Sequence, residues 1–114
     1  MNVKIERLES TFVKEISYIL MKEIKDENIK FVTITDCEIT NDLSYAKVFF
    51  TVFDVNKKQD TIKALNHAKS FIRGELSKRI EIRHTPELSF IFDESIEYGN
   101  KIEKIISDIH KDDE

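Results

Sequence analysis

The residues best suited to chemistry in this sequence are the cations concentrated between residues 57 and 84. This stretch carries 8 Lys and Arg side chains against 3 carboxylates, a net charge of +5, whereas the whole chain has a net charge of −4. Cations gathered on one element suit the phosphates of RNA, because each neutralised phosphate releases counterions. A charge run of this kind is also typical of a helix face that only contacts water. The candidate RNA-binding residues are Lys63, Lys69, Arg73, Lys78, Arg79 and Arg83.

The single cysteine and the three histidines do not form a recognisable catalytic or metal-binding pattern. Cys37 has no His or Lys beside it in sequence, so we expect a small buried residue rather than a nucleophile. One cysteine excludes an internal disulfide and a Cys-based zinc site, and it fits a reducing cytoplasm. His67, His84 and His110 lack the spacing of metal ligands on a helix. A phosphate contact by His84 is conceivable beside Arg83, although a surface histidine without a role is the simpler interpretation.

Four aspartates at predicted strand ends and turns are the remaining candidates for catalysis: Asp36, Asp42, Asp54 and Asp93. Clustered carboxylates could hold a hydrolytic magnesium ion, but turn formation explains the same residues more simply. The chain has only 2 glycines, which excludes a Gly-rich phosphate loop. We therefore predict no enzymatic activity, no cofactor and no small-molecule substrate. A metal-dependent hydrolase stays the least favoured alternative.

Hydrophobic patterning predicts the α+β fold class in a single domain, residues 1–109, followed by an acidic tail, residues 110–114. Periodicity and alternation predict helices over 3–25, 58–81 and 96–109 and strands over 29–40, 44–55 and 87–93. Turn residues at 41–42 predict a hairpin, with a bulge near Asp36–Cys37. The expected architecture is a three-stranded sheet with helices on one face. The apolar runs are too short to cross a membrane, and we expect a monomer.

The second helix is predicted to bend. In a straight helix over 58–81, Lys69 would lie in the apolar stripe of Leu76 and Ile80, where an unpaired ammonium is unfavourable. Either Lys69 snorkels to the surface or the helix changes direction between about residues 68 and 74. We expect Phe71, also at helical spacing, to pack in the core.

Several ordered segments together resemble the ribosome-binding factor A family. They are Leu20–Asp26, Asp42-Leu43-Ser44-Tyr45-Ala46-Lys47-Val48, Ala68-Lys69-Ser70-Phe71-Ile72-Arg73 and Arg83-His84-Thr85-Pro86-Glu87-Leu88-Ser89-Phe90 with Asp93, followed by Ser95, Gly99, Asn100 and Ile102. The resemblance covers about residues 3–109. It implies a type II KH-like fold, in which a helix–kink–helix around Ala68, Ser70 and Gly74 replaces the Gly-x-x-Gly loop. Ser70 occupies the position of the family's kink glycine.

The resemblance also implies a function. Members of this family are non-enzymatic assembly factors that bind the immature 30S ribosomal subunit and contact 16S ribosomal RNA. They assist maturation of the 5′ end of that RNA, leave before translation begins, and often matter most in the cold. The alternative is a protein–protein interaction module without direct RNA contact, in which the acidic C-terminal third of the chain binds the partner.

Overall fold

The computed structural model describes residues 3–94 and confirms the predicted α+β architecture for them. The order is α1 (Val3–Lys22), β1 (Val32–Ile39), β2 (Tyr45–Val52), the 3-10 helix η1 (Val55–Lys57), α2 (Lys58–Arg79) and β3 (Glu87–Phe92). The predicted helix over 96–109 and the acidic tail 110–114 lie outside the described residues. Within residues 3–94, neither helix is both long and apolar enough to cross a membrane.

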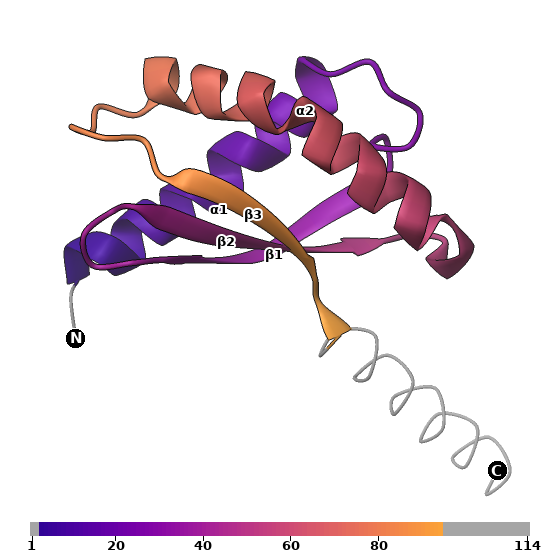
Figure 1. Cartoon of the computed structure of the whole chain (residues 1–114), viewed down its shortest axis with the longest axis horizontal. Coiled ribbons are helices and arrows are strands. Elements are labelled where there is room, and N and C mark those ends of the chain that lie inside the picture. The colour runs from indigo at the N-terminus through magenta and orange to yellow at the C-terminus, as the bar shows by residue number, and fades with distance from the viewer. Residues whose placement is uncertain (1–2, 95–114) are drawn as a thin grey trace, which may run out of the picture.

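The three strands form one mixed sheet in the order β1-β2-β3. β1 and β2 make the predicted antiparallel hairpin, and β3 joins parallel to β2 after the chain has crossed over through α2 (Figure 1). α1 packs against β1, α2 packs against β3, and the two helices contact each other. The buried side of α1 carries Phe12, Ile16 and Ile19, which follow the predicted helical spacing.

The strands bury alternate residues, as predicted. In β2, Ala46, Val48 and Phe50 are buried, while Tyr45 and Lys47 on the other face are exposed. Because only one face of a strand can reach the helices, this alternation fixes which side of the sheet forms the core. The opposite face of the sheet has no helix against it among the described residues.

The predicted bulge in β1 is present but lies slightly earlier in the chain. The pairing with β2 shifts between Ile34 and Asp36, so Thr35 is the extra residue. The Thr35 hydroxyl donates a 2.6 Å hydrogen bond to the Asp93 carboxylate at the end of β3. The bulge returns Cys37 to the buried face, where it is 1% exposed. Burial, helped by the nearby Glu9 carboxylate, raises the pKa of the Cys37 thiol from 9.0 to about 12.

The hairpin turn is held by the Asp42 carboxylate. It accepts hydrogen bonds from the Ser44 backbone N–H at 3.0 Å and from the Thr40 hydroxyl at 2.8 Å. Donation to the charged carboxylate lowers the pKa of Asp42 below its ordinary value of 3.8. Leu43 follows in the left-handed region, with φ of 62°, and its side chain packs against the core. Core contact therefore holds a residue type that seldom adopts this backbone conformation.

The change of direction predicted in the second helix is present (Figure 1), and α2 is one continuous helix through it. Figure 1 shows its axis changing direction between its two halves, so the bend occurs without a break. Lys69 is half-buried near this point. The expectation that Phe71 packs in the core is wrong, since 46% of it is exposed. Successive helical residues point about 100° apart, so a helix that buries Ile72 turns Phe71 to its flank.

Candidate nucleic-acid interface

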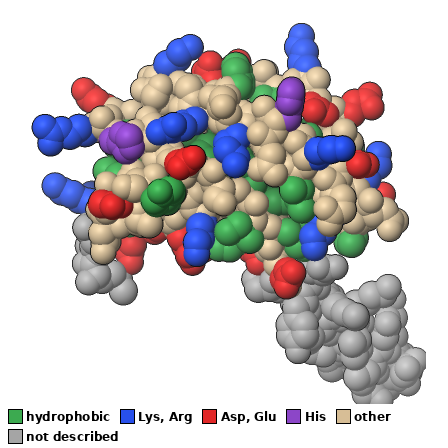
Figure 2. Space-filling view, in the orientation of Figure 1, with side chains coloured by type: hydrophobic (Ala, Val, Ile, Leu, Met, Phe, Trp, Pro, Cys, Tyr) green, Lys and Arg blue, Asp and Glu red, His purple; other side chains and the backbone are tan. Residues whose placement is uncertain are grey.

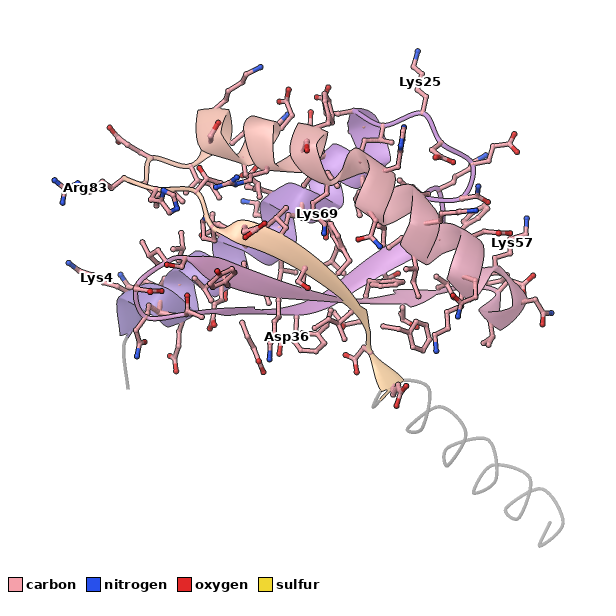
Figure 3. The ribbon with its side chains drawn as sticks, viewed as in Figure 1. Lys4, Lys25, Asp36, Lys57, Lys69 and Arg83 are labelled. Carbon is pink, nitrogen blue, oxygen red and sulfur yellow. The ribbon has the colours of Figure 1, made fainter. Side chains whose placement is uncertain are left out.

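A polar recess lies between the C-terminal half of α2 and the loop that leads into β3. It has a volume of about 430 Å³ and is lined by Ser70, Arg73, Gly74, Ser77, Arg83, His84 and Thr85. We call it the α2 recess. Its lining includes two guanidinium groups, one imidazole and three hydroxyls, and no carboxylate. Figure 2 shows blue Lys and Arg side chains and a purple His side chain together at the left-hand end of the molecule, where Figure 3 labels Arg83.

Arg73 shapes the wall of the α2 recess. Its Nε and Nη2 atoms donate hydrogen bonds of 3.2 and 2.7 Å to the Thr85 carbonyl oxygen. These two hydrogen bonds hold the loop against the helix just before the buried Pro86, which immediately precedes β3. The loop therefore presents Arg83 and His84 beside the helix in a defined position. Both side chains are exposed.

A line of exposed polar residues without a carboxylate runs along α2 from the recess. Residues at three- and four-residue spacing form what we call the α2 polar stripe: Gln59, Lys63, Asn66, His67, Ser70, Gly74 and Ser77, all exposed. None of them is acidic. A stripe of amides, hydroxyls and a cation can donate hydrogen bonds to phosphate oxygens without repelling them.

Arg79, although close in sequence, belongs to a different surface. Its guanidinium lies 3.6 Å from the Glu15 carboxylate, 3.2 Å from Glu23 and 3.8 Å from Glu75. It also lies 4.9 Å from the centre of the Tyr18 ring. These groups join α1 to α2, so the charge of Arg79 is already matched by its own molecule.

Comparison with known proteins identifies the group to which this sequence is related. The family model for ribosome-binding factor A matches residues 4–106. The chain belongs to the ribosome-binding factor A family. The ribosome-binding factor A of Staphylococcus carnosus is 51% identical over 112 residues, with 97% of each chain covered.

Solved structures of this family share the fold. The crystal structure of ribosome-binding factor A from Thermus thermophilus gives a TM-score of 0.70 at 20% identity, covering 76% of this chain and 93% of that chain. A homology model of the Thermus thermophilus protein, fitted into a cryo-EM map of a 30S complex, gives 0.64 at 20% identity, covering 74% and 89%. The resemblance seen in the sequence is thus confirmed at the level of family and fold.

Only part of the predicted RNA-binding set comes together in this family member. Arg73 and Arg83 line the α2 recess with two of the predicted kink residues, Ser70 and Gly74, and Lys63 lies on the α2 polar stripe. The others lie elsewhere on the helix. Figure 3 shows Lys69 below the middle of α2, and the Lys78 ammonium lies 3.6 Å from the Glu75 carboxylate. Arg79 joins the two helices, and the predicted kink residue Ala68 packs against the core.

Two residues of the α2 recess were missed by sequence reasoning. Ser77 lies one heptad after Ser70, so helical spacing alone could have placed it on the same face. Thr85 could not have been found in this way, because its position depends on how the loop folds back onto Arg73. His84, which the sequence left without a firm role, lies in the recess with them.

The aspartates considered for a metal site are engaged separately. Asp42 holds the hairpin turn, Asp54 accepts a 3.0 Å hydrogen bond from the Asn56 N–H at the start of η1, and Asp93 bonds Thr35. No group of three or more His, Cys, Asp or Glu residues within 3–94 is placed to hold a metal ion.

Proposed function

We propose that this protein binds the immature 30S ribosomal subunit with the α2 recess and the α2 polar stripe on the phosphate backbone of 16S ribosomal RNA. The observation that carries the proposal is a recess with two arginines, a histidine and three hydroxyls and no carboxylate. Membership of the ribosome-binding factor A family supports it, as does a neighbour in fold that was fitted into a 30S complex. In this proposal, it acts as a monomer in the cytoplasm.

The proposed role is assembly rather than catalysis. Arginines, hydroxyls and amides that contact phosphates fix the position of a protein on RNA without reading its sequence. A protein holding the RNA backbone in this way favours one folded form of the RNA over others, which is the basis for assisting late maturation of the 16S 5′ end. Trapped RNA conformations escape slowly at low temperature, so we propose that the need for the protein increases in the cold.

The test compares two exposed cations of the same predicted set. Arg83→Gln and Lys78→Gln each remove one positive charge, but only Arg83 lines the α2 recess. For Arg83→Gln we expect about 5-fold weaker binding to small-subunit precursors near 0.15 M salt, and a salt dependence reduced by about one phosphate contact. Lys78→Gln should bind as the unmodified protein does. Binding is measured by co-sedimentation over a series of salt concentrations.

Equal losses for the two variants, or no loss for either, would contradict the proposed site. Arg73 is unsuitable for this comparison, because its two hydrogen bonds to the Thr85 carbonyl oxygen help to hold the loop in place. A change at Arg73 would therefore alter the shape of the recess as well as its charge.

A further inference from the structure

Two phenylalanine rings are exposed side by side on the part of the molecule remote from the α2 recess. Phe31 is 65% exposed and Phe53 is 88% exposed, and their ring centres are 6.1 Å apart. Phe31 precedes β1 and Phe53 follows β2, so the Val32–Val52 pairing brings them together. Neighbouring Lys57 lies at the right-hand end of Figure 3, and Arg83 lies at the left-hand end. Aromatic surface left in water on this scale often marks a binding site.

The backbone that carries these rings is held in place. The Thr61 hydroxyl, buried at the start of α2, donates a 2.9 Å hydrogen bond to the Asn28 carbonyl oxygen. Ile29 is fully buried, its N–H donates to the Asp26 carbonyl, and its own carbonyl accepts from the Val32 N–H. The segment before Phe31 is therefore anchored to α2 and to β1. The exposure of the Phe31 ring follows from how this segment is held in the fold.

A cavity of about 320 Å³ opens beside the two rings, and Lys30, Phe31, Val52, Phe53, Lys57 and Thr61 are among the residues that line it. This volume is at the lower end of the range for ligand pockets, which suits one flat ring system better than a large ligand. The cavity thus offers aromatic stacking at its wall and room for one planar group.

Two lysines lie beside the rings and can contact an anionic group of a ligand. The Lys30 ammonium lies 5.6 Å from the centre of the Phe31 ring, and Lys57 lines the same cavity. Two carboxylates also lie here, Glu27 and Asp54, but the Asp54 carboxylate is turned to the Asn56 N–H that it caps. Aromatic rings flanked by lysines can stack a base and bind the adjoining phosphates.

We propose that Phe31 and Phe53 form a stacking platform for an unpaired base of single-stranded RNA, with Lys30 and Lys57 on its phosphates. This inference rests on the proposed function and adds a base contact to the phosphate contact of the α2 recess. The platform selects unpaired RNA over duplex, because a base inside a duplex has no free face to offer. It does not select a sequence, since every base has a flat face.

The experiment uses a ten-residue oligouridylate and an oligomer of the same length and charge without bases. Binding is measured by fluorescence anisotropy for the full chain, for the Phe31→Ala/Phe53→Ala double variant and for Tyr45→Ala. Tyr45 is the matched control because it is 59% exposed at the opposite end of β2. We expect the double variant to bind oligouridylate about 5- to 150-fold more weakly than the unmodified chain. Its binding to the abasic oligomer should be unchanged, and Tyr45→Ala should match the unmodified chain with both.

Three results overturn the platform: an unmodified chain that binds the two oligomers equally, one that binds neither, or a double variant that keeps the preference for bases. A double variant that keeps this preference but loses association with small-subunit precursors would assign the rings to a protein contact instead. Failure of the α2 recess is recognised separately, because Arg83→Gln should weaken binding of both oligomers alike. Far-UV circular dichroism and the urea midpoint verify that each variant is folded.

Discussion

Residues of the same type have different tasks in this molecule because their neighbours differ. Arg79 is surrounded by three carboxylates and joins α1 to α2, whereas Arg73 is used to hold a backbone carbonyl. Arg83 makes no such contact within the described part of the chain and is exposed. The three residues contribute equally to the net charge of the 57–84 stretch, but only Arg83 can offer its whole charge to a ligand. Counting charges along the sequence therefore overstates the binding surface.

Cys37 gives a prediction about alkaline stability. Its pKa is about 12 in the folded protein and 9.0 without burial, so the unfolded chain releases the thiol proton first as pH rises. The stabilising contribution is complete below pH 9 and is lost as pH rises from 9 towards 12. Between pH 9 and 11, the free energy of unfolding should fall in the unmodified chain by roughly 1 kcal/mol per pH unit relative to Cys37→Ala. Urea unfolding of both proteins at each pH measures this difference, and parallel curves would contradict it.

At the level of elements, strand alternation was the most informative pattern in the sequence. The buried and exposed faces of β2 and β3 follow it residue by residue, because one face of each strand meets the helices and the other does not. The bulge at Thr35 was predicted to within two residues from the same loss of alternation. Local pattern thus fixed the sheet and its inward face.

Features that depend on contacts between distant segments were not predictable in this way. The Phe31–Phe53 pair requires the register of the hairpin, which the bulge shifts by one residue. The α2 recess requires the loop after α2 to fold back onto Arg73. The bend in α2, by contrast, was predicted from local signals, because Lys69 falls in the apolar stripe and a Ser and a Gly lie close to it.

Gly74 tests whether the bend in α2 depends on a glycine. A Cβ atom added at Gly74 would meet no atom within 4 Å, and the backbone there is helical without a positive φ. Gly74→Ala should therefore raise the free energy of unfolding by about 0.5–1 kcal/mol, the difference in helix propensity. Urea unfolding gives the value, with Ser70→Ala as a second exposed position on the same face. A Gly74→Ala protein less stable than the unmodified one would show that the bend needs glycine.

At the scale of the whole molecule, the two candidate contacts lie at opposite ends. Figure 3 places Arg83 of the α2 recess at one end and Lys57, beside the aromatic platform, at the other. The α2 polar stripe runs along the helix between them. In the proposed function, an acidic molecule with a net charge of −4 contacts RNA only along this narrow track, while its remaining surface discourages non-specific coating.

This separation predicts that losses at the two ends combine independently. Sites without shared partners have additive free energies, so the affinity losses of Arg83→Gln and Phe31→Ala/Phe53→Ala for small-subunit precursors should multiply in the triple variant. Co-sedimentation at fixed salt measures all three proteins. A triple variant no weaker than the weaker of the two parents would mean that the ends do not engage the same particle together.

The parallel pairing of β3 with β2 has a consequence for how the protein is made. The rings, the hairpin that aligns them and the Thr61 anchor all lie within residues 28–61, whereas the recess needs the loop through Thr85 and the strand after it. Because synthesis proceeds from the N-terminus, all residues of the proposed stacking platform are joined to the chain before the last residues of the α2 recess. A nascent chain stalled between Thr61 and Thr85 would contain every residue of the platform but not those that complete the α2 recess.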